Sequence, residues 1–164
     1  MIFITVGTHE QPFDRLLKCI DKLVEEGKIK EEIICQKGYT DYEPRNYKAE
    51  KLIPYEQMQE NIEKAQIIIT HGGPASFIAP LSIGKIPIVV PRKKEFNEHV
   101  NNHQLDFSKE VEKRMKNIIV VETDEEIEDA IINYEKKVKK LSNKNNSNNK
   151  VFNDRLKEEI EKII

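Results

Sequence analysis

The chain has 164 residues, of which 38% are hydrophobic and 34% charged, and its formal net charge at pH 7 is −2. This length suits one domain with a substantial core, and the lack of a basic excess predicts no nucleic-acid partner. No apolar run approaches the ~20 residues that cross a bilayer, so we expect any membrane contact to be peripheral or made through a partner.

The first predicted element is a buried strand at residues 2–6, followed by a glycine-containing loop at residues 7–12. The strand is short, lacks a basic flank and ends at a glycine, so it is not interpreted as a signal sequence. On that reading, Cys19 and Cys35 are expected to be reduced thiols of a cytoplasmic protein. A helix that Gly27 is suited to end follows, with the apolar face Phe13, Leu16, Leu17, Ile20, Leu23 and Val24.

Short strands and helices alternate through the middle of the chain. Residues 32–36 and 51–53 are predicted as strands, and residues 56–65 as a small helix. The polar residues 39–49 have no periodicity that would assign them to an element. Residues 67–91 then give a strand, a tight turn, a helix and a second strand, the unit from which parallel sheets are built.

The turn in this last unit has the composition of an anion site. Gly72 and Gly73 lack a Cβ and can let a ligand approach the backbone. Pro74 suits the first turn of a helix, whose free amides attract anions such as phosphate, and Ser76 adds a hydroxyl there. His71, at the carboxyl end of the strand, is expected to point at the ligand. The alternative is a Gly-Gly turn that only joins a strand to a helix.

A helix is predicted from about residue 97 or 98 to residue 116, with the apolar residues Val100, Leu105, Phe107, Val111 and Met115. Its first half is rich in side chains that hydrogen-bond, which suits a sugar or a ribose. They are Glu98, His99, Asn101, Asn102, His103 and Gln104. His99 and His103 have the i, i+4 spacing of a zinc pair, but a third ligand is not evident, so no metal or other cofactor is predicted.

The C-terminal part begins with a predicted strand at residues 117–121. A helix capped by Thr123 or Asp124 follows, with the apolar stripe Ile127, Ile131, Tyr134 and Val138. The Asn-rich residues 142–150 are predicted to be a flexible linker, and residues 151–164 an amphipathic helix. That helix has Phe152, Leu156, Ile160 and Ile163 on one face, and it must dock on its own domain or on another chain.

Three segments in this order resemble the C-terminal domain of family 28 glycosyltransferases: MIFITVGTHEQPFDRLL, THGGPASFIAPLSIGKIPIVVPR and EFNEHVNNHQ. The resemblance covers residues 1–121. It is strongest to small bacterial capsule and exopolysaccharide proteins (beta-1,4-galactosyltransferase-like), similar to the catalytic subunit of the two-subunit eukaryotic N-acetylglucosaminyltransferase. It implies an α/β fold in which helices flank a Rossmann-like parallel sheet, equivalent to the C-terminal, donor-binding half of a GT-B glycosyltransferase. Residues 1–141 would then be a nucleotide-sugar-binding domain.

The resemblance also implies which residues bind the nucleotide-sugar. The first loop would face the diphosphate with Gly7, Thr8 and His9. The segment before the small helix would contact the uracil with Leu52, Ile53 and Tyr55. The second turn would face the phosphates with His71, Gly72, Gly73, Pro74, Ala75 and Ser76. The donor sugar would contact Asn101, His103 and Gln104. Many relatives carry an acidic residue on the helix after the second turn to hold the ribose, whereas residues 77–80 here contain none.

The predicted function is that of the donor-binding and catalytic subunit of a two-component, inverting hexosyltransferase. It would move galactose or N-acetylglucosamine from a UDP-sugar to a lipid-diphosphate-linked acceptor in capsule or exopolysaccharide synthesis. A membrane-associated partner subunit would bind the acceptor and recruit the chain to the inner face of the membrane. Helix-start amides and the hydroxyls of Thr8 and Ser76 would stabilise the departing UDP.

The residue that deprotonates the acceptor is left open. His9 and Glu10 are candidates for this base, and the partner could equally supply it. His9 could instead be an exposed loop histidine, and Glu10 could simply complement a helix dipole. One alternative function is a non-catalytic accessory subunit that binds and activates the partner. Another, a free-standing epimerase, needs a second domain for which this chain lacks the length. An exposed partner face predicts self-association of the isolated chain.

Overall fold

Six parallel strands form the centre of the computed structural model, which describes residues 1–144, 154–155, 157–158 and 161–162. The strands are β1 (Ile2–Thr5), β2 (Ile33–Gln36), β3 (Lys48–Glu50), β4 (Ile67–His71), β5 (Ile88–Val90) and β6 (Ile119–Val120). Their order in the sheet is β3-β2-β1-β4-β5-β6, and every neighbouring pair is parallel. Because this order reverses between β1 and β4, a crevice is expected at the carboxyl ends of these two strands.

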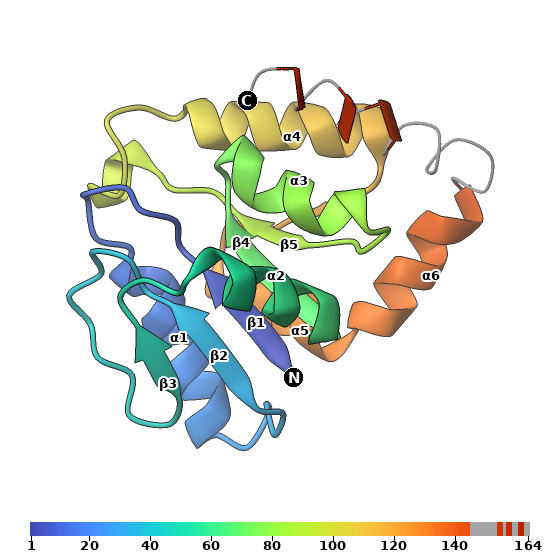
Figure 1. Cartoon of the computed structure of the whole chain (residues 1–164). Coiled ribbons are helices and arrows are strands. Elements are labelled where there is room, and N and C mark those ends of the chain that lie inside the picture. Colours follow the sequence, from blue (N-terminus) through green and yellow to red (C-terminus); the bar gives the residue numbers. More distant parts are fainter. Residues whose placement is uncertain (145–153, 156, 159–160, 163–164) are drawn as a thin grey trace.

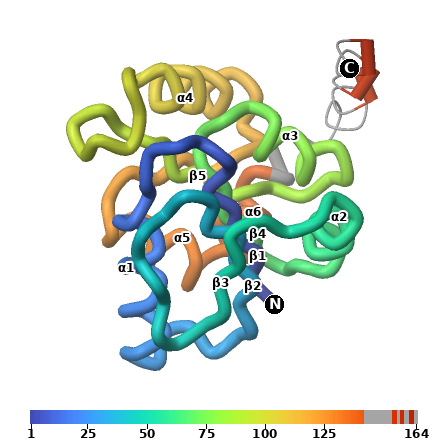
Figure 2. The backbone as a smooth tube through the Cα atoms, turned by 60° about the vertical axis from the view of Figure 1, so that its left-hand side comes forward, coloured from blue at the N-terminus to red at the C-terminus, as the bar shows by residue number. Residues whose placement is uncertain are grey.

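Helices cover both faces of the sheet (Figure 1). They are α1 (Asp14–Glu25), α2 (Tyr55–Lys64), α3 (Pro74–Ser82), α4 (His103–Met115), α5 (Asp124–Ile132) and α6 (Tyr134–Lys144), with a short 3₁₀ turn, η1, at Lys94–Phe96. Figure 2 shows the strands between α1 and α5 on one side and α2 and α3 on the other. The predicted α/β fold, a Rossmann-like parallel sheet flanked by helices, is therefore confirmed.

Alternation of side chains along β1 divides the core into two layers. Ile2 and Ile4 pack with α1 and α5, whereas Phe3 packs with Ile62 of α2 on the opposite face. A third apolar cluster joins α3 to β5, where Phe77 and Leu81 contact Val89. Within the described residues, none of the helices combines the length and apolarity needed to cross a bilayer.

Two predicted helix ends are confirmed. Gly27 adopts a φ of 71° directly after α1, a conformation that costs glycine little. Thr123 caps α5 with a capping box: its hydroxyl accepts from the Glu126 amide, and the Glu126 carboxylate accepts from the Thr123 amide.

The strand predicted at residues 51–53 is wrong, because the edge strand β3 lies at Lys48–Glu50. This strand is exposed on its outer side, so no apolar run marks it in the sequence. The Ile53 amide instead donates to the side chain of Gln36, at 2.9 Å, outside any strand pairing.

The helix predicted to begin at residue 97 or 98 begins only at His103, and this prediction is also wrong. Asn97 has a left-handed φ of 55° that ends η1, and the carboxylate of Glu98 turns inward to Arg15. Of the residues expected to make this helix's apolar face, Val100, Phe107 and Met115 are exposed.

The single helix expected after Thr123 is divided at Asn133 into α5 and α6. Helix α6 ends at Lys144, three residues into the segment predicted as a linker. Residues 145–153 lie outside the described residues, as do the four apolar positions of the predicted C-terminal helix. The domain boundaries and the docking of that helix stay predictions.

Asp21 of α1 holds the loop that the sequence left unassigned. Its buried carboxylate accepts four hydrogen bonds, from the Tyr42 hydroxyl, the amides of Arg45 and Asn46, and the Asn46 side chain, all between 2.7 and 2.9 Å. Burial alone would raise the pKa of Asp21, but these hydrogen bonds outweigh burial and lower it.

We predict that Asp21→Asn lowers the free energy of unfolding by about 2 kcal/mol at pH 7, because an amide cannot accept all four bonds. A lowered folded-state pKa stabilises the fold above the unfolded pKa of about 4, and this contribution is lost as the pH falls through the folded value. The difference in free energy of unfolding between wild type and variant, measured with urea, should therefore become smaller from pH 7 to pH 3. The exposed Asp41→Asn is the control, expected within about 0.5 kcal/mol of wild type; a matching result for Asp21→Asn would contradict the prediction.

Candidate functional site

The loops after β1, β2 and β4 meet through their glycines at the carboxyl edge of the sheet. A Cβ on Gly7 would lie 2.4 Å from Nε2 of His71, and one on Gly73 would lie 2.2 Å from the same ring. A Cβ on Gly38 would lie 2.3 Å from the carbonyl oxygen of Gly7. We expected Gly72 and Gly73 to expose backbone to a ligand, whereas Gly73 and Gly7 first of all make room for the His71 ring.

The ring of His71 faces the turn and not an open crevice, and it is 8% exposed. Its Nδ1 accepts a hydrogen bond from the Gly73 amide at 3.0 Å, and its Nε2 lies 2.7 Å from the Ser76 hydroxyl. Burial, followed by the charge of Arg92, lowers the pKa of His71 to about 4, so the ring is neutral at pH 7. The expectation that His71 points at the ligand is thus not met, because its two nitrogens are both used within the turn.

Gln104 links the same turn to the next strand. Its Oε1 accepts from the Gly72 amide at 3.1 Å and from the Arg92 amide at 3.2 Å. A Cβ on Gly72 would lie 2.8 Å from the Gln104 Cβ, so α4 packs directly against the turn. The amides of Gly72 and Gly73 are therefore both taken by side chains. Pro74 has no amide hydrogen, which leaves Ala75 as the first free amide at the start of α3.

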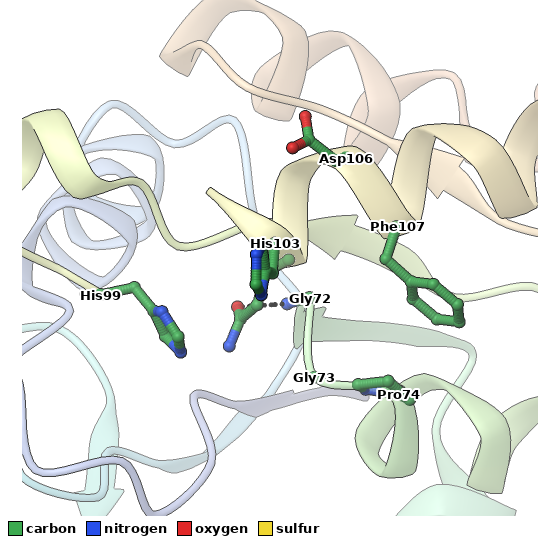
Figure 3. A pocket seen from close by; sticks show the side chains of 8 residues that line it. Gly72, Gly73, Pro74, His99, His103, Asp106 and Phe107 are labelled. Atoms are coloured by element: carbon green, nitrogen blue, oxygen red, sulfur yellow. Dashed lines mark hydrogen bonds between the residues drawn. The ribbon is translucent and has the colours of Figure 1, made fainter. Parts of the chain in front are cut away.

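A pocket of about 540 Å³ opens beside this turn (Figure 3). It is lined by Gly72, Gly73, Pro74, His99, His103, Gln104, Asp106 and Phe107. Five of these were predicted as site residues. His99 was named only among the polar side chains that suit a sugar, and Asp106 and Phe107 were not predicted. Asn101, predicted to contact the sugar, does not line it; its side-chain oxygen accepts from the His103 amide at 3.0 Å, in a local turn that leads into α4.

His9 lies across from this pocket, with its ring centroid 4.6 Å from that of His99. Its Nδ1 accepts from the Gln11 amide at 3.2 Å. Burial, followed by the charges of His99 and Arg92, lowers the pKa of His9. Because Nδ1 accepts a hydrogen bond, the neutral ring carries its proton on Nε2. In this arrangement His9 offers a ligand a donor. Thr8 and Glu10 are exposed beside it.

The segment predicted to contact uracil is partly open to solvent. Leu52 is 54% exposed and Tyr55, at the start of α2, is 76% exposed. Ile53 is buried in the core, and its amide is already bonded to Gln36. The backbone of Leu52, the Ile53 carbonyl and the side chains of Leu52 and Tyr55 are therefore groups that this segment could offer a base.

The sequence did not identify Arg92, which is fully buried beneath the first loop. Its guanidinium donates to the carbonyls of Val6 and Gln11, each at 2.7 Å, and of Glu98 at 3.1 Å. The cation also lies 4.9 Å from the centroid of the Phe13 ring. Burial lowers the pKa of Arg92 to about 10, so it remains charged at pH 7. The position of Arg92 just after an apolar strand was the sequence feature that could have indicated its role.

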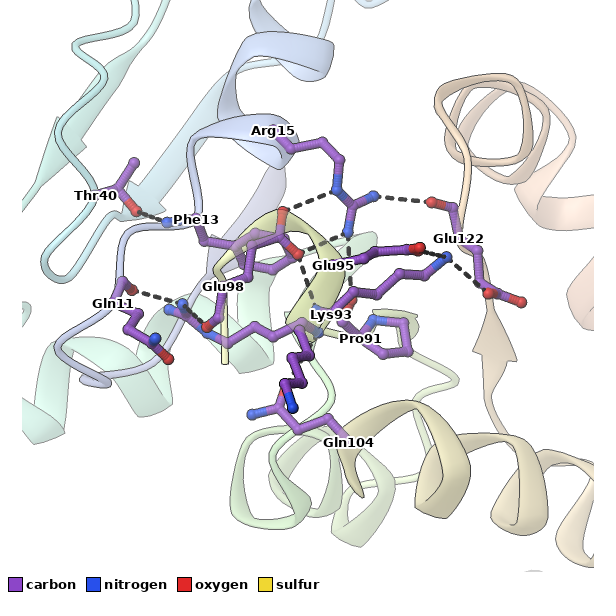
Figure 4. A network of polar contacts seen from close by, with 12 residues as sticks. Gln11, Phe13, Arg15, Thr40, Pro91, Lys93, Glu95, Glu98, Gln104 and Glu122 are labelled. Carbon is purple, nitrogen blue, oxygen red and sulfur yellow. Dashed lines mark hydrogen bonds and ion pairs between the residues drawn. The ribbon is translucent and has the colours of Figure 1, made fainter. Parts of the chain in front are cut away.

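Arg15 and Glu98 extend this network (Figure 4). The two carboxylate oxygens of Glu98 accept from Arg15 at 2.9 and 3.1 Å, and one of them also accepts from the Lys93 amide. Arg15 further donates to the carbonyl of Glu122, after β6, at 2.8 Å. The network therefore joins the loops after β1, β5 and β6 into one unit.

In the part of the chain that the structure describes, there is no group of three or more His, Cys, Asp or Glu side chains placed to hold a metal ion. His99, His103 and Asp106 line the same pocket, but they are not placed as such a group.

We predict that Arg92→Lys lowers the free energy of unfolding by about 2–4 kcal/mol, because an ammonium cannot reproduce the planar fork that binds three carbonyls. Urea unfolding at pH 7 measures this loss. The control is Lys94→Ala, two residues away and exposed, which should change stability by no more than about 0.5 kcal/mol. Similar midpoints for the two variants would show that the buried guanidinium is dispensable.

A second prediction separates backbone strain from contact with His71. Gly7 and Gly27 have nearly equal φ values, 75° and 71°, but only Gly7 has a neighbour within 4 Å of an added Cβ. Alanine at either position should lower the free energy of unfolding by about 1–2 kcal/mol, because the backbone there is left-handed. Gly7→Ala should cost about 1–3 kcal/mol more, because its methyl meets the His71 ring. Thermal unfolding of both variants tests this, and equal costs would refute the contact.

Known proteins were compared with the chain. The profile of the glycosyltransferase family 28 C-terminal domain matches residues 1–161. The human protein named "UDP-N-acetylglucosamine transferase subunit ALG13" is 32% identical over 121 residues, which make up 68% of this chain and 10% of that protein. The chain thus spans about a tenth of the length of this curated relative. Since the profile covers almost every residue, the chain belongs to the family of glycosyltransferase family 28 C-terminal domains.

Proposed function

We propose that the chain binds a UDP-sugar and forms the donor-binding, catalytic half of a two-component, inverting glycosyltransferase. The observation that carries this proposal is the contact between the two glycine turns at the point where the strand order reverses. Gly7 follows β1, His71 and Gly73 follow β4, and the turns meet at the His71 ring. Ligands of open α/β sheets bind in the crevice at this position, and nucleotide phosphates suit helix starts there.

The diphosphate would lie at the start of α3. This helix has Pro74 in its first turn and no acidic residue there, so its positive end is not neutralised. The Ala75 amide, the hydroxyls of Ser76 and Thr8 and the Nε2 proton of His9 would be donors to the phosphate oxygens. Because these groups stabilise the charge that develops on departing UDP, we expect the transfer not to depend on a metal ion.

The pocket beside the turn would hold the donor sugar. It combines the polar side chains of His99, His103 and Gln104 with the apolar ring of Phe107, a lining that suits the hydroxyl groups and faces of a pyranose. Leu52 and Tyr55 would contact the uracil. The name of the similar human protein includes UDP-N-acetylglucosamine. N-acetylglucosamine is therefore one candidate for the transferred sugar, and galactose is the other.

A second subunit would bind the acceptor. His9 is placed to donate and not to accept a proton, which leaves Glu10 or a residue of the partner as the base. The similar human protein is itself named as a subunit. We propose a membrane-associated partner that binds a lipid-diphosphate-linked sugar of capsule or exopolysaccharide synthesis and recruits this chain to the cytoplasmic face of the membrane.

A non-catalytic accessory subunit is the second candidate function. It is favoured by the absence of a carboxylate from α3, where Phe77 and Pro80 are buried and Ile78 and Ala79 are apolar. Ribose would then have to be held by other groups, and weak UDP binding without turnover would result. A partner face left open could also make the isolated chain form homo-oligomers.

Calorimetric titration of the purified chain with UDP, in magnesium and in EDTA, tests the proposal. We expect binding that is equal in both buffers and is lost in Gly73→Val, whose side chain would displace the His71 ring. The control is Ser82→Val, which introduces the same side chain at an exposed position in the last turn of α3, away from the His71 ring. No UDP binding by folded wild type would contradict the donor-half proposal and favour the accessory subunit.

A further inference from the structure

The contacts of His71 define which of its nitrogens carries the proton. A backbone amide can only donate, so the hydrogen bond from the Gly73 amide requires an unprotonated Nδ1. The neutral ring must then hold its proton on Nε2, which lies 2.7 Å from the oxygen of Ser76. His71 is therefore the donor in this pair, and Ser76 is the acceptor.

This assignment determines what the Ser76 hydroxyl can do. Its oxygen already accepts from His71, and its own hydrogen has no acceptor among the described residues. Ser76 is partly exposed in the first turn of α3, so this hydrogen can reach a ligand. The ring cannot move aside easily, because Gly7 and Gly73 pack against it from two directions.

We propose that His71 is a positioning residue that fixes the Ser76 hydroxyl as an outward hydrogen-bond donor to an anionic oxygen of the ligand. The inference rests on the proposed function, in which that oxygen belongs to the diphosphate of a UDP-sugar. It gives Ser76 particular weight, because the amides of Gly72 and Gly73 are already taken by Gln104 and His71. A hydroxyl locked in this way favours acceptor oxygens over donor groups of a ligand.

The tautomer can be measured without a ligand. A two-bond ¹⁵N–¹H correlation spectrum of the imidazole rings at pH 7 should show the His71 proton on Nε2 and an unprotonated Nδ1. The low pKa of the buried ring agrees with a neutral imidazole at this pH. A proton on Nδ1, or on both nitrogens, would overturn the proposal whatever the variants do.

Binding of UDP and of uridine measures the role of the hydroxyl. Ser76→Ala should weaken UDP binding about ten- to a hundredfold, the usual effect of removing a hydrogen bond to a charged group, and leave uridine binding within about twofold. Ser82→Ala removes a hydroxyl at the far end of the same helix and should bind UDP as wild type does. Equal UDP affinity in Ser76→Ala and wild type would refute the inference alone, whereas no UDP binding by folded wild type would refute the proposed function as well.

His71→Asn tests whether the histidine acts through Ser76. Asparagine can place an oxygen near the Nδ1 position to accept from Gly73, but it has no group at the Nε2 position. We expect weaker UDP binding with unchanged uridine binding, and no further loss when Ser76→Ala is added, because coupled residues are not additive. Additive losses would contradict the coupling. If His71→Asn does not fold, the imidazole spectrum and the UDP affinity of Ser76→Ala still test the proposal.

Discussion

The buried guanidinium of Arg92 is the constraint on which the carboxyl edge of this sheet depends. A cation without solvent is costly, and here it is compensated by three carbonyls and the Phe13 ring. These carbonyls belong to the loop after β1 and to the segment after β5, which are separated by about eighty residues. The Val6 amide still donates to the carbonyl of Gln36 in β2, and the shared cation adds to this contact in fixing the position of the two loops relative to each other.

The His71 ring has the corresponding role in the floor of the site. It fills a space that only glycines at positions 7 and 73 leave open, and it is hydrogen-bonded at both nitrogens. Arg92 lies close enough to lower the pKa of this ring, as burial also does. Two preorganised groups thus restrict the loops after β1 and β4 before any ligand binds, which would reduce the entropic cost of the proposed binding.

Local patterns in the sequence predicted the sheet and the glycine turns, because apolar runs and Gly-Pro chemistry act over a few residues. They failed at β3, an exposed edge strand without an apolar run, and at residues 97–102, where Glu98 is turned inward by Arg15, 83 residues earlier. The same limit applies to the site. The residues of the turn were identifiable, but the loss of the Gly72 amide to Gln104, 32 residues later, depends on tertiary contact alone.

This distribution of hydrogen bonds limits how strongly the chain alone could bind a diphosphate. If the turn amides were free, the chain would hold a diphosphate largely by itself. With two of them engaged, binding depends on the Ala75 amide, on a few hydroxyls and on the dipole of a nine-residue helix, each a modest contribution. In the proposed function, the chain alone would therefore bind the donor weakly, and because His9 would present a proton and not a lone pair, Glu10 would be the base candidate that this chain retains. The chemistry of the residues themselves therefore favours an active site that a second subunit completes.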